Sequence, residues 1–318
     1  TLAVGKIAPQ TFYAPATVKV EDEETTEEKR KTVRSGFVTI LMIDQTVNQQ
    51  VKEKLDLVLV EGNELRKIAG LFPFVKTSLL SLSSQQYLRS AEEWQWRTVL
   101  AVVETSSSPL QERTLLTSPE LGKRFLDSGI QLSTGRQKQV VEELLQYRQS
   151  VSPEAFAGLT NVIIQSRTDY AEAVKALSLS AEKNIPPLYD ASLLDLPDSV
   201  WKETLVALPR VADRILTQGI SPGLPPNLLQ AAITMQLQGE VPRSTQLLSR
   251  NLLMATLQPN LAKDEEQTRL RAERAAEEVK PEMVSIQQGE VIVWAGEPIT
   301  QPDFVLLDHF NLSRRGID

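Results

Sequence analysis

The sequence predicts a mostly α-helical protein in which a helical insertion domain interrupts a small α+β module formed by the N- and C-terminal segments. Three observations predict this fold class. Short β-rich runs occur near both ends, helix-forming residues fill the centre, and two similar acidic stretches open helical runs at opposite ends. We expect residues 1–60 together with 259–318 to form the composite α+β module, and residues 61–258 to form the all-helical insertion. The termini should then lie close together.

The N-terminal segment is expected to alternate strand and helix. Prolines exclude a helix interior from the first fifteen residues, and Val18–Val20 favours a short strand. A helix should follow, with Asp22 or Thr25 as its N-cap and glutamates in its first turn. The run "FVTILMI" at 37–43 predicts a buried strand, and the helical pattern that begins with "QTVNQQ" comes next.

The centre is predicted to be a series of helices separated by proline-rich loops. One helical run covers 82–104, a second follows a Ser-Pro start at 118–129, and another follows the similar start at Ser152. A later helix should be capped by Asp198 and split or kinked by Pro209.

The C-terminal segment becomes β-rich again. The run "MVSIQQGEVIVWAGEPIT" predicts a hairpin around Gly289, with Gly296 closing its second strand and Trp294 packed within the strands. The run "QPDFVLLDHFNL" predicts a short final helix.

The two acidic stretches correspond position by position. When Thr26 is aligned with Thr268, 242 positions later (268 − 26), Asp22 falls on Asp264. Each stretch runs into a basic helix and then into a β-rich segment. We therefore predict that they are two versions of one strand-flanked helix, packed together in a single module.

Composition excludes several classes of function. The chain has 318 residues, a formal net charge of −7, no cysteine and one histidine. Disulfides, zinc–thiolate sites and cysteine nucleophiles are excluded, and neither a His-rich metal centre nor a broad nucleic-acid surface is expected. No stretch approaches the roughly 18 apolar residues of a membrane span. Because the chain starts at Thr1 without Met or a signal peptide, we expect it to be a piece of a longer protein.

Few residues are candidates for binding. The acidic stretches lack the Gly turn of a calcium loop, so charged helix N-termini are favoured over metal binding. Their residues are Glu21, Asp22, Glu23, Glu24, Asp264, Glu265 and Glu266. His309 is expected to be structural, with pH sensing as the alternative. Trp94 and Trp96 lie two apart and so on different helix faces; burial is favoured for both, and lining a ligand cleft or a protein contact is the weaker alternative.

Both ends of the chain resemble one family. The opening "VGKIAPQTFYAPATVKVEDEETTEEKR" is similar to the start of the extracellular region of bacterial seven-transmembrane HD-domain receptors. The close "PNLAKDEEQTRLRAERAAEEVKPEMVSIQQGEVIVWAGEPITQPDFVLLDHFNL" resembles the end of the same region. The match is thin over the helical centre. After the first basic helix, "RSGFVTILMI" lacks the proline of the "V.PVY"-like stretch that relatives often carry.

The resemblance implies an extracytoplasmic sensor or input domain of a membrane receptor that regulates a cytoplasmic HD-type cyclic-dinucleotide phosphodiesterase. The phosphodiesterase, which in relatives hydrolyses cyclic di-AMP, is not in this chain. Membrane helices flanking both termini, anchorage in the plasma membrane and an unidentified small-molecule or envelope ligand are implied as well. The alternative is an assembly or dimerisation module that docks another envelope protein. An enzyme in this chain, a cofactor and a nucleic-acid partner are not expected.

Overall fold

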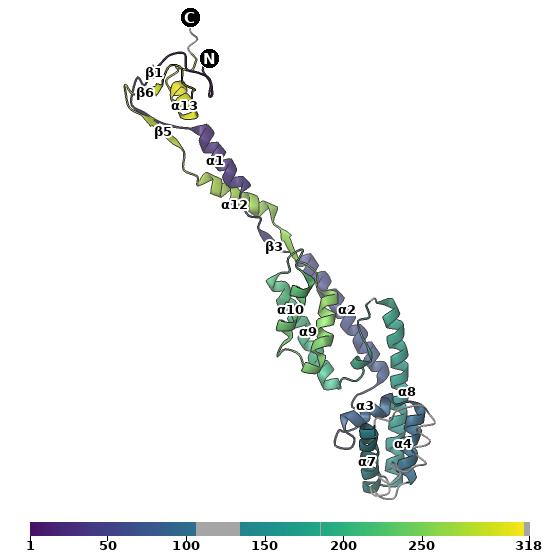
Figure 1. The fold of residues 1–318 in the computed structure, drawn as a ribbon. Coiled ribbons are helices and arrows are strands. Elements are labelled where there is room, and N and C mark those ends of the chain that lie inside the picture. The colour runs from purple at the N-terminus through teal and green to yellow at the C-terminus, as the bar shows by residue number, and fades with distance from the viewer. Residues whose placement is uncertain (106–133, 185, 315–318) are drawn as a thin grey trace. The chain divides into compact units, whose positions relative to one another are not determined.

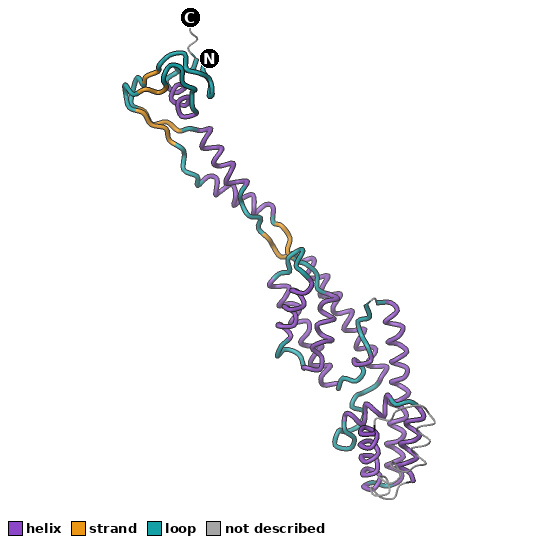
Figure 2. Tube along the Cα trace, viewed as in Figure 1, coloured by secondary structure: helices purple, strands orange, loops and turns teal. Residues whose placement is uncertain are grey.

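The computed structural model describes residues 1–105, 134–184 and 186–314 (Figure 1). Helices dominate, and the strands are short and pair in twos, which confirms the predicted fold class (Figure 2). The chain divides into two compact units. We call residues 1–42 with 262–318 the terminal module, and residues 43–261 the helical unit. No helix in the described ranges is long and apolar enough to cross a membrane.

The terminal module is built from segments of both chain ends. Its elements are β1 (Phe12–Tyr13), β2 (Val18–Glu21), α1 (Glu23–Ser35), α12 (Glu265–Glu277), β5 (Met283–Ile286), β6 (Val291–Val293) and α13 (Gln301–His309). The chain passes between the two units within β3 (Leu41–Ile43) and β4 (Leu261–Lys263). The described strands pair as β1–β6, β2–β5 and β3–β4, so each pair joins an N-terminal strand to a C-terminal one.

The hairpin predicted for the C-terminal segment is wrong. β5 pairs antiparallel with β2, with Val18 opposite Ile286, and β6 pairs antiparallel with β1. Gly289 still turns the chain, at φ +86°, but its N–H donates to the carbonyl of Ala14 (2.8 Å). Two β-rich runs around a glycine look like a hairpin whether or not they pair with each other. Trp294, expected to pack within the strands, is 54% exposed.

The N-terminal repeat is the strand–helix–strand segment β2–α1–β3. At its start, the N–H of Asp22 donates to the carbonyl of Glu282 (2.8 Å), and the N–H of Glu282 donates to Oγ1 of the buried Thr26 (2.9 Å). The carboxylate of Asp22 also accepts from the N–H of Thr25 (3.1 Å), which makes Asp22 the N-cap of α1. Asp22 thus caps α1, and the backbone of Asp22 together with the hydroxyl of Thr26 holds Glu282, the residue before β5.

The C-terminal repeat, β4–α12–β5, makes the same bonds. The N–H of Asp264 donates to the carbonyl of Ile40 (2.9 Å), and the N–H of Ile40 donates to Oγ1 of Thr268 (2.9 Å). Ile40 and Glu282, the two outside partners, are again 242 positions apart (282 − 40). Since α1 packs against α12 in one unit, the prediction that Thr26 and Thr268 lie in a single module is confirmed.

A small apolar core closes the module beside the repeats. α13 packs on β2, β5 and β6, and its N-terminus carries a capping box formed by Thr300 and Asp303. The N–H of Leu2 donates to the carbonyl of Ser313 (3.1 Å), so the first and last described segments lie together, as predicted. The core residues are Ala8, Phe12, Ala14, Ile286, Ile292, Val293, Ile299, Leu306 and Leu307.

The helical unit contains two apolar cores. Its described elements are α2 (Gln45–Ala69), α3 (Leu82–Ser90), α4 (Glu93–Thr105), α7 (Thr134–Ser150), α8 (Pro153–Lys183), η1 (Ala191–Leu193), α9 (Asp198–Gln218), α10 (Pro226–Leu237), η2 (Arg243–Thr245) and α11 (Gln246–Thr256). One core joins α2, α9, α10, α11 and the C-terminal part of α8. The other joins α3, α4, α7 and the N-terminal part of α8, so the long α8 contributes to both. The helix expected over 118–129 lies outside the described residues.

Residues 37–104 differ from the sequence expectations in three places. α2 runs unbroken through residue 60, and both of its halves enter the same core, so the compact unit begins at Ile43 rather than after residue 60. The strand expected over 37–43 is limited to β3, and its Leu41 is 45% exposed. The helical run 82–104 divides into α3 and α4 because Ala91 is extended (ψ 146°).

α9 also differs from its prediction. It continues past Pro209, because Leu208 and Val211 on either side of the proline are fully buried in the core. That packing outweighs the roughly 3 kcal/mol that an interior proline costs a helix. Asp198 does not cap α9. Its carboxylate instead accepts from Arg66 (2.6 Å) and from the N–H of Phe72 (3.2 Å).

Candidate ligand cleft

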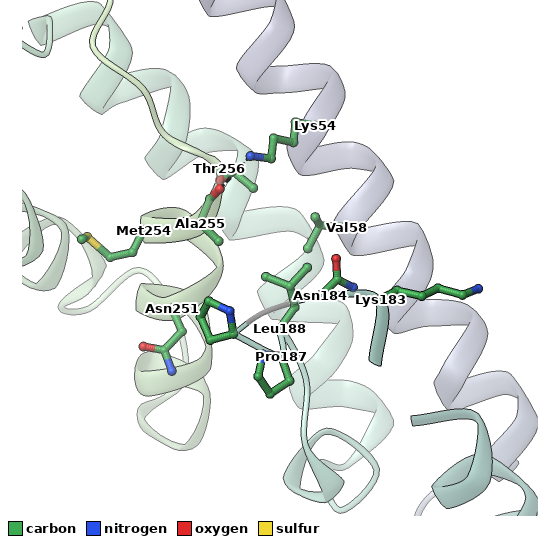
Figure 3. A pocket seen from close by; sticks show the side chains of 11 residues that line it. Lys54, Val58, Lys183, Asn184, Pro187, Leu188, Asn251, Met254, Ala255 and Thr256 are labelled. Atoms are coloured by element: carbon green, nitrogen blue, oxygen red, sulfur yellow. Dashed lines mark hydrogen bonds between the residues drawn. The ribbon is translucent and has the colours of Figure 1, made fainter. Parts of the chain in front are cut away.

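A cleft of about 760 Å³ opens in the helical unit between α2, α11 and the segment that follows α8 (Figure 3). Its volume falls in the range of about 300–1,000 Å³ that is usual for small-molecule sites. The lining residues are Lys54 and Val58 from α2, Lys183, Asn184, Pro186, Pro187 and Leu188 from the end of α8 and the segment after it, and Asn251, Met254, Ala255 and Thr256 from α11.

One wall of the cleft depends on a close approach of two chain segments. The hydroxyl of Tyr189, directly after the lining segment, donates to the carbonyl of Val58 on α2 (2.6 Å). A Cβ atom at Gly62 would lie 2.6 Å from that hydroxyl, so only glycine leaves room for the tyrosine. Burial raises the pKa of Tyr189, which therefore keeps its proton and remains a donor. These contacts fix the Pro-Pro segment against α2.

The lining combines apolar surface with cationic and amide groups. Val58 and Leu188 supply apolar surface, and Asn184 and Asn251 supply amide groups, while the exposed ammonium of Lys183 extends away from Val58 and Leu188 (Figure 3). Nζ of Lys54 donates to the carbonyl of Ala255 (2.9 Å). The lining contains two lysines and no carboxylate. Such a surface favours a small anion with an apolar part, because the ammonium groups attract the charge and the apolar wall holds the rest.

A second polar centre lies where the two cores of the helical unit meet. Arg66 of α2 pairs with Asp198 of α9 (2.6 Å) and donates to the carbonyl of Leu193 (2.5 Å). Arg89 of α3 is fully buried, donates to the carbonyl of Leu194, and pairs with Asp195 (3.3 Å). These bonds tie α2 and α3 to the segment that leads into α9.

Burial sets the electrostatics of this centre. It lowers the pKa of both arginines, although Asp198 and Asp195 oppose that shift. It also raises the pKa of Asp195, against the attraction of Arg89. The guanidinium of Arg89 lies 4.3 Å from the ring centroid of Phe72 and 4.8 Å from that of Tyr170. Because each charge already has a counter-charge or ring, this centre is better suited to structure than to capturing a ligand.

The two tryptophans named from the sequence lie elsewhere. Trp96 is 4% exposed and belongs to the core of α3, α4 and α7. Trp94 is half-buried, and its indole N–H donates to the carboxylate of Glu92 (2.6 Å). Neither side chain lines the cleft. A contact of either one with a ligand remains a prediction.

The acidic stretches and the histidine have the following positions. Asp22 and Asp264 are the N-caps of α1 and α12, with glutamates in the first turns of both helices. Within the described ranges, no three His, Asp or Glu side chains gather as metal ligands would. His309 is exposed at the end of α13, with its ring edge-on to Phe310 at 5.3 Å between centroids.

The cleft could not be predicted from local sequence patterns, because its walls come from three distant segments. Lysines and asparagines on helices are common, and nothing local marks Lys183 or Asn251 as neighbours. The Pro186–Pro187 pair after a 31-residue helix was the available signal. It marks a rigid segment that cannot continue the helix, and such a segment can line a cavity.

The chain matches a known class of extracellular domain. The family described as 7TM-HD extracellular matches residues 3–314, so the chain belongs to this family. Membership places the chain outside the cytoplasm, in a membrane protein, as a sensor-type rather than a catalytic domain.

A curated relative aligns with this chain over its whole length. The uncharacterized protein slr0104 of Synechocystis sp. (strain ATCC 27184 / PCC 6803 / Kazusa) is 33% identical over 321 residues, which cover all of this chain. The chain spans only 37% of that relative's length. No solved structure matches this chain.

Proposed function

We propose that the chain is the input domain of a membrane receptor that regulates a cytoplasmic HD-type cyclic-dinucleotide phosphodiesterase, and that it senses a small anionic ligand in the cleft. The observation that carries the ligand class is the lining itself, with two lysines, two asparagines, an apolar wall and no carboxylate. Family membership and the greater length of the relative support attachment to a membrane-bound effector.

The mechanism is a shift between two packings of the helical unit. The cleft is lined by α2, α11 and the segment after α8, which all contribute to one core. A ligand that contacts these elements more favourably in one packing than in another shifts the equilibrium towards that packing. The size of the shift is limited by the difference between the two affinities.

A binding screen tests the ligand class. We expect small anions with an apolar part, sought among cell-wall fragments, nucleotides and amino acids, to raise the Tm of the chain. Lys183→Ala should weaken binding by about 2- to 5-fold, as expected for the loss of one exposed positive charge at the rim of the cleft. Lys175→Ala removes an exposed lysine from the same helix outside the cleft, and should leave the affinity unchanged. Equal losses in both variants, or no ligand at all, would contradict the proposal.

The regulatory step needs its own measurement. In the full-length receptor, a ligand found in the screen should change the rate of cyclic-dinucleotide hydrolysis, and Lys183→Ala should shift that response to higher ligand concentration. A ligand that binds without altering hydrolysis would separate binding from regulation and remove the sensor function.

One observation favours a second candidate function, an assembly or dimerisation module. α2 and α8 pack together, and they expose Leu57 (71%), Val60 (57%) and Leu179 (61%). Light scattering on the chain decides this point, since an interface built on these side chains would raise the measured mass and Leu57→Lys would restore the monomer.

A further inference from the structure

A separate group of exposed apolar side chains lies on the terminal module. Val4, Ile7, Tyr13 and Trp294 are 48%, 59%, 55% and 54% exposed. Backbone bonds bring the segments of Val4 and Ile7 next to the segment that follows Trp294. The N–H of Gly5, which follows Val4, donates to the carbonyl of Ile299 (2.9 Å). Ile7 bridges to Pro298, and the N–H of Gly296 donates to the carbonyl of the next residue along, Ala8 (2.9 Å).

The exposure of Ile7 follows from the alternation of inward and outward side chains along these two extended segments. Ala8 and Ile299 point inward and are each 1% exposed, while their neighbours Ile7 and Pro298 point outward. The module therefore has apolar residues on both sides of one two-stranded segment. The inner side forms the core, and the outer side has no cover within the described residues of this module.

This outer face is nearly free of charge. Residues 1–17 contain one charged side chain, Lys6, and residues 291–300 contain one, Glu297. A partner recognised by charge has little to bind here. Tryptophan and tyrosine with aliphatic neighbours and balanced charge are typical of protein surfaces at a membrane–water interface, where the rings contact both lipid and water.

The position of the chain ends points to the same surroundings. The N–H of Leu2 donates to the carbonyl of Ser313, so both end segments lie together on the terminal module, where Figure 1 marks the two termini. Val4 is two residues from Leu2. Since the family is an extracellular domain of a membrane protein, membrane helices attached at both ends would bring this face against the bilayer.

We propose that Val4, Ile7, Tyr13 and Trp294 form a lipid-contacting face that inserts into the headgroup region of the outer surface of the membrane. The proposal rests on the proposed function, in which the chain is part of a membrane receptor, and on the membrane helices at both ends that the family resemblance implies. It does not depend on the cleft, on a ligand, or on the phosphodiesterase.

Spin labelling tests the face directly. The described chain has no cysteine, so Ile7→Cys and Trp294→Cys each add one attachment point for a nitroxide within this domain. The full-length receptor, with cysteines outside this domain replaced, is placed in nanodiscs of phosphatidylcholine and phosphatidylglycerol. Collision rates with oxygen, which partitions into lipid, and with a water-soluble nickel chelate are then measured. Val38→Cys is the matched control, because Val38 is an 82% exposed apolar residue in the same module, beyond the other end of α1.

We expect the labels at positions 7 and 294 to collide several-fold more often with oxygen than with nickel, and the label at 38 to show the opposite ratio. Nickel access at 7 and 294 equal to that at 38 would overturn the proposal. Low access to both reagents, with dipolar broadening between labels, would overturn it in favour of a contact with a second copy of the chain. Lipid contact without any ligand-dependent change in hydrolysis would leave the face intact and remove the sensor function instead.

Discussion

The terminal module and the helical unit are stabilised by different kinds of interaction. The helical unit buries long apolar faces of its helices in two cores. The terminal module has one small core, and its two repeats are joined by backbone bonds and by the hydroxyls of Thr26 and Thr268. Stability is thus distributed over many apolar contacts in the helical unit, whereas in the terminal module a larger share depends on a few hydrogen bonds between the repeats.

The largest expected effect belongs to the helical unit. Leu208→Ala removes a fully buried side chain from α9, and should lower the free energy of unfolding by about 2–5 kcal/mol. Leu247→Ala, at a 61% exposed position of α11, should change it by less than about 0.5 kcal/mol. Urea unfolding followed by circular dichroism measures both. Similar losses in the two variants would show that the described core is not where the stability lies.

The next effect is specific to the terminal module. Thr26→Val keeps the shape but leaves the N–H of Glu282 without its acceptor, which should cost about 1–3 kcal/mol. Thr26→Ser retains the hydroxyl and should lose less. Thr268→Val, at the equivalent but half-buried position, should also lose less, because water can reach the freed N–H of Ile40. Amide hydrogen exchange at Glu282 and Ile40 reports each bond separately, and unchanged protection of Glu282 in Thr26→Val would show that the Thr26 hydroxyl does not hold this N–H.

A smaller effect depends on pH. Burial alone would raise the pKa of Asp22, but hydrogen bonds from Thr25 and Gln301 outweigh it and hold the pKa below the ordinary value of 3.8. The stability from this carboxylate is therefore fully present above pH 3.8 and is lost as the pH falls through the lower folded-state value. Asp22→Asn can still cap α1 but cannot titrate. At pH 6 the free energy of unfolding of this variant should be lower than that of the unmodified chain, and below pH 3 the two values should converge. A difference that stays constant with pH would contradict this assignment.

The smallest effect is expected from a surface ion pair of the terminal module. Nζ of Lys29 lies 2.5 Å from Oε2 of Glu282, yet the two side chains are 51% and 47% exposed. Glu282→Gln should therefore change the free energy of unfolding by about 0–1 kcal/mol, and less at high salt. The backbone of Glu282, which carries the bonds to Asp22 and Thr26, is unaffected by this substitution. A loss larger than that of Thr26→Val would reverse the order proposed here.

Local signals were enough to predict the repeats and the starts of α1 and α8. The Asp-Glu-Glu opening followed by Thr places a capping carboxylate and a hydroxyl at fixed positions, and this meaning does not depend on the rest of the chain. Ser152 caps α8 for the same reason, as expected from its Ser-Pro-Glu start. The fold class followed from where these signals occur along the chain.

Pairing between distant segments could not be read from local signals. The alternation of β5 and β6 fits a hairpin as well as it fits separate pairing with β2 and β1, so the wrong partner was chosen. Pro209 has a known local cost, but the burial of Leu208 and Val211 that offsets it becomes visible only in the folded core. The cleft escaped prediction in the same way, because Lys54, Lys183 and Asn251 become neighbours only after folding.

The interlocked repeats also determine the order in which this protein can be completed. During synthesis β2 and α1 emerge before the helical unit, and their partners β5 and α12 follow more than 200 residues later. The helical unit lies between them in sequence. Its two ends lie close together, since the N–H of Asp44 donates to the carbonyl of Asn260 (2.7 Å). Once the helical unit has folded, the two repeats are connected across a short distance and no longer by a long flexible loop. Less conformational entropy is therefore lost when the repeats join. Until then the edges of β2 and β3 stay unpaired, which leaves the N-terminal half of the terminal module exposed to mispairing until its C-terminal half has been made.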